Sequence, residues 1–86
     1  MNIYITNLSL NIIEADLSKL FSTYGIVDFV VISRDKKTGR SKGMAFVEMP
    51  IQTQGEQAIL ALNNLKIDGL ILSVQELQYK AGEFNN

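Results

Sequence analysis

The order of hydrophobic patterns along this chain leaves few folds open. Apolar residues that alternate with period two indicate a strand, whereas apolar residues that recur every three to four positions indicate a helix. Helical patterns occupy residues 14–24 and the segment that follows Pro50. Strand patterns, rich in β-branched and aromatic residues, occupy residues 3–6, 27–33, 44–49 and 70–77. The predicted order is therefore β-α-β-β-α-β, in a single domain of 86 residues that can bury one modest core.

Each helix has boundary signals of its own. The first helix is expected over residues 14–24, with Glu14 and Asp16 in its first turn and Gly25 as the stop. Asn11 is the nearest good capping residue, although Ile12 and Ile13 blur the start. The second is expected to begin with the capping-box spacing of residues 53–56 (Thr-Gln-Gly-Glu) and to end at residues 63–64. The predicted buried stripes are Leu17, Leu20, Phe21 and Tyr24 in the first helix and Ala58, Ile59, Ala61 and Leu62 in the second.

Right-handed β-α-β crossovers joined by a hairpin give one antiparallel sheet with both helices on the same face. This arrangement is the α+β, ferredoxin-like βαββαβ sandwich with a four-stranded antiparallel sheet. In it the third strand lies between the first and the second, so the first and third strands are central neighbours. No part of the chain is predicted to cover the opposite face of the sheet, and function is expected on that face.

Period-two alternation decides which side chains point to the uncovered face. On the first and third strands it directs Tyr4, Met44 and Phe46 there. On the second strand Phe29 and Val31 point the same way unless a bulge turns them inward, so their exposure is left open. An apolar surface of this kind needs a reason, and nucleic-acid bases supply one, since a base that stacks on an aromatic ring gains about 1–3 kcal/mol. The simpler alternative is a cross-strand pair of Tyr4 and Phe46 that only stabilises the sheet.

A cluster of positive charge follows the second strand. Five of the eight Lys and Arg residues fall within residues 34–42, together with one acid, Asp35, so this segment has a charge of +4 in a chain of net charge −1. Charge alone favours a solvated hairpin loop. The loop is also expected at one end of the uncovered face, where Arg40 and Lys42 are placed to hold the phosphates of a nucleic acid.

Two segments resemble the paired signature motifs of the RNA recognition motif family. Residues 42–49 (Lys-Gly-Met-Ala-Phe-Val-Glu-Met) match five of the seven defined positions of the family octamer, and Met44 and Met49 stand where an aromatic is usual. Residues 3–8 (Ile-Tyr-Ile-Thr-Asn-Leu), which include Asn7, match the family hexamer in full. The resemblance extends from residue 2 to about residue 77, and the chain is similar in extent to the small single-domain RNA-binding proteins of bacteria.

The resemblance implies that the open sheet binds single-stranded RNA with help from the basic loop. It assigns base stacking to Tyr4 and Phe46, phosphate contact to Lys42, and an apolar contact with sugar or base to Met44. Polar residues of the last strand, Gln75 among them, are expected to read base edges. Single-stranded DNA stays open as a partner, because no residue can be tied to a 2′-hydroxyl. The site expected from the sequence comprises Tyr4, Asn7, Phe29, Arg40, Lys42, Met44, Phe46 and Gln75.

Two other classes of function are compatible with such a fold. The first is a protein-interaction module, in which the apolar sheet face receives a peptide or a second copy of the chain. Against it, residues 65–68 (Leu-Lys-Ile-Asp) stand where peptide-binding relatives carry an Arg-x-Phe element. The second is an enzyme. The loop of residues 7–11 holds no Arg to grip a phosphate, and no convergent pair of carboxylates is evident, so no catalytic activity is expected.

Missing residue types narrow the expectations further. The chain has no Cys and no His, which removes thiolate metal sites and the commonest general base, so neither a metal nor a cofactor is expected. Its longest apolar run, residues 29–32, is far shorter than the roughly 20 residues of a membrane span, and its start lacks the features of a secretory signal. We expect a cytoplasmic, monomeric domain of residues 1–79 with a short polar tail of residues 80–86, and weak self-association stays open.

Overall fold

The computed structural model describes residues 1–78, so Tyr79 and the tail expected at residues 80–86 lie outside the described residues. The elements follow the predicted order, with one additional hairpin. They are β1 (Asn2–Thr6), α1 (Glu14–Ser22), β2 (Phe29–Arg34), β3 (Ser41–Glu48), α2 (Gln52–Leu62), β4 (Lys66–Ile67), β5 (Leu70–Ile71) and β6 (Ser73–Leu77). The periodic segments of the sequence therefore coincide with both helices and with the four longer strands.

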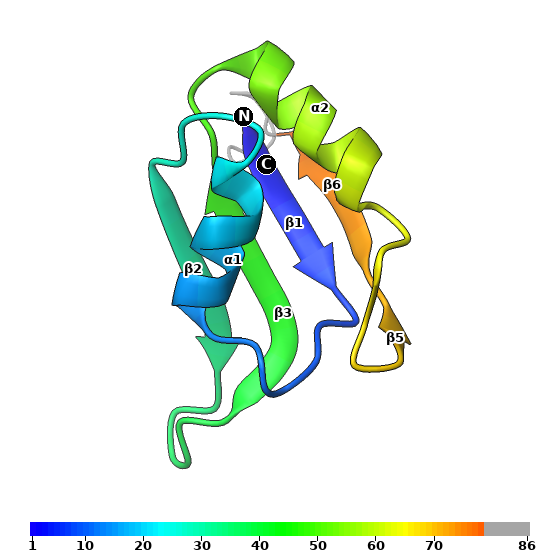
Figure 1. The fold of residues 1–86 in the computed structure, drawn as a ribbon. Coiled ribbons are helices and arrows are strands. Elements are labelled where there is room, and N and C mark those ends of the chain that lie inside the picture. The colour runs from blue at the N-terminus through cyan, green and yellow to red at the C-terminus, as the bar shows by residue number, and fades with distance from the viewer. Residues whose placement is uncertain (79–86) are drawn as a thin grey trace, which may run out of the picture.

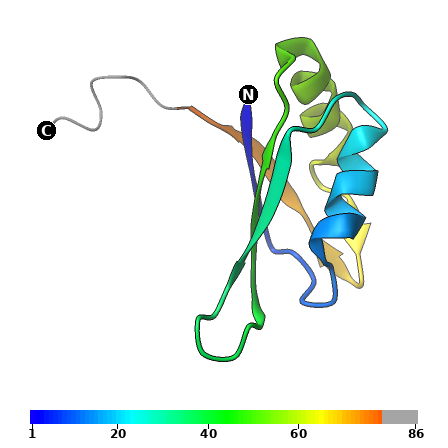
Figure 2. The same ribbon diagram turned by 90° about the vertical axis from the view of Figure 1, so that its left-hand side faces the viewer.

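The four longer strands form one antiparallel sheet in the order β2-β3-β1-β6. As predicted, β3 lies between β2 and β1. Both helices lie against the same face of the sheet, α1 over β2 and β3 and α2 beside β6 (Figure 1). Seen edge-on, the described strands have both helices on one side (Figure 2). The ferredoxin-like α+β sandwich is confirmed, and no helix or strand among residues 1–78 covers the other face.

The hydrophobic core lies between the sheet and the helices. Ile3 and Ile5 of β1 and Ala45 and Val47 of β3 are buried, because alternation along a strand directs every second side chain toward the helices. The helices contribute Leu17, Phe21, Ala58 and Leu62, which are buried as well. Full burial of a large apolar side chain stabilises a fold by about 1.5–3 kcal/mol. A shift of the strand register by one residue would turn the buried strand side chains away from the core. The core therefore also fixes which strand residues point to the uncovered face.

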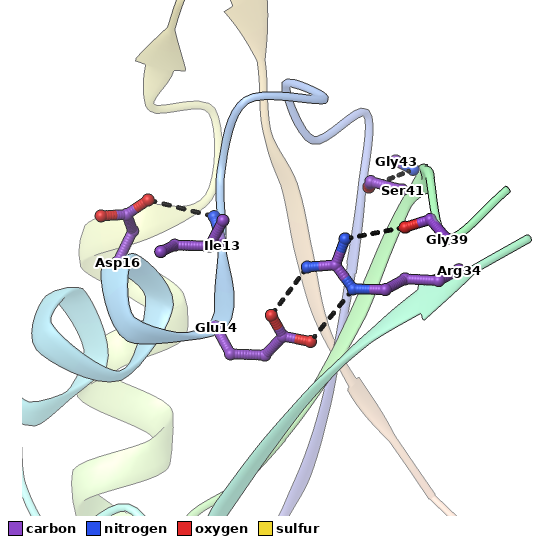
Figure 3. Close-up of polar contacts among 7 residues, drawn as sticks. All are labelled: Ile13, Glu14, Asp16, Arg34, Gly39, Ser41 and Gly43. Carbon is purple, nitrogen blue, oxygen red and sulfur yellow. Dashed lines mark hydrogen bonds and ion pairs between the residues drawn. The ribbon is translucent and has the colours of Figure 1, made fainter.

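α1 begins at Glu14 and has Glu14 and Asp16 in its first turn, as predicted, but its cap is not the residue that the sequence offered. Asn11 is not the cap; the last residue before the helix is Ile13, whose backbone N–H donates to Oδ2 of Asp16 at 3.0 Å (Figure 3). The chain forms a separate turn first, in which the N–H of Ile12 donates to the carbonyl oxygen of Ser9 at 3.1 Å. That turn uses the residues that would otherwise lead into a helix, so α1 begins only after it.

The start of α2 also differs. The helix begins at Gln52 without a side-chain cap, which places Thr53 inside the helix, and the capping-box prediction is wrong. The cause is an earlier start, because the N–H of Gly55 already donates to the carbonyl oxygen of Ile51 at 3.1 Å. Ala61, predicted in the buried stripe, is exposed, because the helix turns its buried face to Gly55, Ala58 and Leu62.

The last strand is shorter than residues 70–77, because a small hairpin precedes it. β4 and β5 pair around Asp68 and Gly69, whose φ angles of +53° and +80° suit the tight turn that Asp-Gly favours. Leu72 then separates β5 from β6. Its N–H donates to the carbonyl oxygen of Leu65 at 2.8 Å, and its own carbonyl oxygen accepts from Asn64 at 2.9 Å. Leu72 therefore pairs with the segment after α2 and not with β1.

Candidate nucleic-acid interface

Strand register arranges the side chains of the uncovered face in rows that cross the sheet. One row, which we call the aromatic row, takes one residue from each longer strand: Val31, Phe46, Tyr4 and Gln75. Tyr4 and Phe46 occupy its centre and are half-buried, whereas Val31 and Gln75 at its ends are exposed. Their sequence neighbours Ile3, Ile5, Ala45 and Val47 are buried in the core, so the aromatic row belongs to the face without helices.

Tyr4 and Phe46 are in direct contact. Their ring centroids lie 5.0 Å apart with the ring planes inclined at 32°. The Tyr4 hydroxyl donates to Sδ of Met44, 3.2 Å away, so the methionine that replaces an aromatic also packs at this centre. Such an arrangement stabilises the strand pairing, and it also holds two aromatic rings in place before any ligand arrives.

The second strand enlarges this apolar surface. Phe29 is 50% exposed and Val31 is 40% exposed, so no bulge turns them toward the core. The sequence left the exposure of these two side chains open, and the structure shows that both are exposed. Phe29 lies opposite Glu48, one row beyond the aromatic row.

The loop between β2 and β3, residues 35–40, is ordered by a single aspartate. Oδ1 of Asp35 accepts from the backbone N–H of Thr38 at 2.9 Å and from that of Lys37 at 2.8 Å. These N–H groups stabilise the charged carboxylate and lower the pKa of Asp35. The N–H of Asp35 donates in turn to the carbonyl oxygen of Arg40 at 2.8 Å and closes the loop. The basic loop therefore has a defined backbone, with its cationic side chains exposed.

Arg34, at the end of β2, is held by other groups. Its Nη2 and Nε donate to the two carboxylate oxygens of Glu14 at 2.8 Å and 3.4 Å, and its Nη1 donates to the carbonyl oxygen of Gly39 at 3.2 Å (Figure 3). The hydrogen bond from Arg34 lowers the pKa of Glu14. Among residues 1–78 this is the one ion pair, so Arg40 and Lys42 keep exposed charges that no carboxylate in that part of the chain neutralises.

Gly43 shapes the strand end that carries Lys42 and Met44. Its φ is +77°, and the pairing of β2 with β3 shifts register at this point. Its carbonyl oxygen accepts from the N–H of Leu8 at 3.0 Å, and a Cβ on Gly43 would lie 3.2 Å from the carbonyl oxygen of Leu8. Only glycine adopts this conformation so close to another backbone without strain.

Asn7 makes a contact that sequence reasoning did not foresee. It has a left-handed backbone with φ +59°, and its Nδ2 donates to the carbonyl oxygen of Ile71 at 2.9 Å. Nearby, the hydroxyl of the buried Ser9 donates to Oδ2 of Asp68 at 2.6 Å. Both bonds attach the loop after β1 to the β4–β5 hairpin. The structure thus gives Asn7 a scaffolding contact, and its part in RNA binding stays a prediction.

Other parts of the described chain offer less to a ligand. Within residues 1–78 no group of three or more acidic, His or Cys side chains is placed to hold a metal ion. No helix in the same part of the chain combines the length and the apolar character that a membrane span requires. A hollow of about 460 Å³ lies at the β6 edge beside α2 and is lined largely by Met1, Ile59, Leu60 and Val74. The uncovered sheet face, with its aromatic row and adjoining cations, is therefore the candidate site.

Two helices behind a sheet whose exposed face carries a central aromatic pair define the class of open-faced α+β sandwich domains. The sequence profile of the RNA recognition motif matches residues 3–73. The chain belongs to the RNA recognition motif family.

Known relatives are similar over most of the chain. RbpE and RbpD of the cyanobacterium Nostoc sp. are 41% and 43% identical over 76 residues, which make up 88% of this chain and 77% and 81% of those proteins. The crystal structure of RNA Binding Protein PG1 superposes with a TM-score of 0.87 at 38% identity and covers 93% of this chain and 96% of that one. The Sxl-lethal protein, solved in a complex with RNA, gives a TM-score of 0.81 at 41% identity over 86% of this chain and 46% of that chain.

Proposed function

We propose that this protein binds single-stranded RNA on the uncovered face of its sheet. The observation that carries the proposal is the aromatic pair of Tyr4 and Phe46, half-buried at the centre of a face that no described element covers. Each ring offers a surface for one base, and stacking of this kind tolerates any base. Two adjacent rings on neighbouring strands suit two successive bases of one strand.

The cations at the loop end of the sheet supply the second part of the interaction. Arg40 and Lys42 follow the ordered turn of Asp35, so their charges stand where β3 begins. A strand of RNA whose bases lie on the aromatic row has phosphates within reach of that end. Attraction from a few cations is modest in a chain of net charge −1, so we expect salt-sensitive binding of moderate affinity.

Membership of the family supports the proposal. The relative solved with RNA has the same fold at 41% identity, and PG1 is described by its name as an RNA-binding protein. The alternative occupant of this face is a peptide or a second copy of the chain. The affinities of the two kinds of partner should depend differently on salt, because salt screens contacts with phosphates and does not screen an apolar interface.

The proposal is tested with fluorescently labelled random 12-mers of RNA and the double variant Tyr4→Ala/Phe46→Ala. The loss of two stacking rings should weaken binding by roughly 100-fold at low salt, since each stacked base contributes about 1–3 kcal/mol. Leu60→Ala is the matched control, because Leu60 is an exposed apolar residue of α2 on the helix side of the sheet. Equal binding by the double variant and the wild type, or no binding by the wild type, would refute the platform.

A further inference from the structure

A second row of side chains crosses the uncovered face next to the aromatic row. Strand register pairs Phe29 of β2 with Glu48 of β3, Glu48 with Asn2 of β1, and Asn2 with Leu77 of β6. Glu48 stands two residues beyond Phe46 on the same strand, which corresponds to about 7 Å along it. A base that stacks on Phe46 or on Phe29 therefore has the Glu48 carboxylate beside its edge.

This carboxylate is in an unusual place for a surface that receives a polyanion. Glu48 is half-buried and ends β3, whereas Lys42 lies near the opposite end of that strand, so the face is positive at one end and negative at the other. The ion pair in the described part of the chain joins Arg34 to Glu14, and no Lys or Arg of residues 1–78 pairs with Glu48. A phosphate beside Glu48 would be repelled. RNA is therefore accommodated at this end only where it presents base edges that carry hydrogen-bond donors.

The donors that suit a carboxylate differ among the bases. An ionised carboxylate is an acceptor only, with two oxygens side by side. The Watson–Crick edge of guanine offers two adjacent donors, the ring N1–H and the exocyclic amino group, and its O6 can accept from an amide such as that of Asn2. Uracil offers one N–H between two carbonyl oxygens, and a carboxylate repels these oxygens. Adenine and cytosine offer one amino group each.

We propose that Glu48, together with Asn2, makes the platform selective for a base with an exocyclic amino group, with guanine the best fit and uracil the worst. This inference rests on the proposed RNA binding and adds a substrate preference to it. The aromatic row provides affinity for any base, and the row of Phe29, Glu48 and Asn2 reads the edge of one of them. The preference concerns a single nucleotide, because Glu48 is the one carboxylate among the residues of the aromatic row and of this second row.

The experiment uses octamers of uridine with one central position occupied by guanine, inosine or uracil. Inosine keeps the ring N1–H of guanine and lacks the amino group, so the guanine-to-inosine ratio of affinities isolates the proposed bond. For the wild type we expect guanine to bind roughly tenfold more tightly than inosine, the discrimination typical of a good base-edge contact. Glu48→Gln should bring that ratio close to one and should bind the all-uracil octamer more tightly, since an amide can donate to a uracil carbonyl.

Glu56→Gln is the matched control, because Glu56 is an exposed residue of α2 and its substitution removes the same charge. It should leave the guanine-to-inosine ratio at the wild-type value. A wild-type ratio near one, or a ratio that Glu48→Gln leaves unchanged, would overturn the preference while the platform stands. If the wild type binds none of the octamers at low salt, both the platform and the preference fall.

Discussion

Gly39 and Gly43 have nearly the same backbone conformation in different surroundings. Their φ angles are +73° and +77°, but a Cβ on Gly39 would meet nothing within 4 Å, whereas one on Gly43 would lie 3.2 Å from the carbonyl oxygen of Leu8. An L-residue in the left-handed region costs about 1–2 kcal/mol. We expect Gly39→Ala to lower the free energy of unfolding by about that amount, and Gly43→Ala to lower it further because the Leu8 backbone must also move. Urea unfolding of the two variants measures the difference, and equal losses would contradict the close approach.

Tyr4 and Phe46 of the aromatic row could be predicted from the sequence, because burial of every second residue on β1 and β3 leaves their neighbours to the other face. The exposure of Val31 could not, because a bulge in β2 would have turned it inward. The contact of Asn7 could not be predicted. Its partner Ile71 is 64 positions away, and the contact depends on a hairpin that no hydrophobic period signals. Side-chain bonds to distant backbone atoms follow from the assembled fold and not from local pattern.

Whole elements were predicted better than their ends. In each helix and each longer strand, the spacing of the apolar residues fits either the helical period or the strand period, but not both. The order of these elements could therefore be predicted from the sequence. Helix starts depend on competition among nearby hydrogen bonds, and at α1 the turn between Ser9 and Ile12 displaced the expected cap. The two-residue strands β4 and β5 are too short to show any period, and Asp68-Gly69 is their sequence signal.

The loop between β2 and β3 makes a prediction about pH. The N–H groups of Thr38 and Lys37 hold the pKa of Asp35 below its ordinary value. A lowered pKa in the folded state means that the contribution to stability is present above the unfolded pKa of about 3.9 and is lost as the pH falls through the folded value. We expect the free energy of unfolding to decline as the pH is lowered from about 5, and Asp35→Asn to reduce that decline because asparagine does not titrate.

The measurement is chemical denaturation at a series of pH values. Asp28→Asn is the control, since Asp28 is exposed and lies outside the loop. It should keep the wild-type pH dependence. The Glu14 carboxylate, whose pKa Arg34 lowers, adds a decline of the same sign that added salt weakens, so the comparison is made at constant ionic strength. A pH profile that Asp35→Asn leaves unchanged would show that the bonds within the loop do not contribute to stability.

The molecule as a whole separates its charges. Its net charge is −1, yet residues 34–42 carry +4, and on the uncovered face Glu48 lies at the end of β3 away from them. In the function that we propose, attraction for nucleic acid therefore comes from this segment of the chain and not from the total charge. For this reason the overall composition could not decide whether the uncovered face binds RNA or binds an apolar protein surface.

Salt dependence decides between these two surfaces. For a single strand, the logarithm of the binding constant falls against the logarithm of salt concentration with a slope of about −0.7 per phosphate neutralised. If Arg40 and Lys42 each neutralise one phosphate, Arg40→Gln/Lys42→Gln should make the slope shallower by about 1.4. Lys66→Gln, on β4, removes a cation outside the basic loop and should leave the slope unchanged. A slope near zero for the wild type would contradict phosphate contact and favour the apolar alternative. An equal change of slope per cation at Arg40, Lys42 and Lys66 would indicate general electrostatic attraction without specific phosphate contacts of the basic loop.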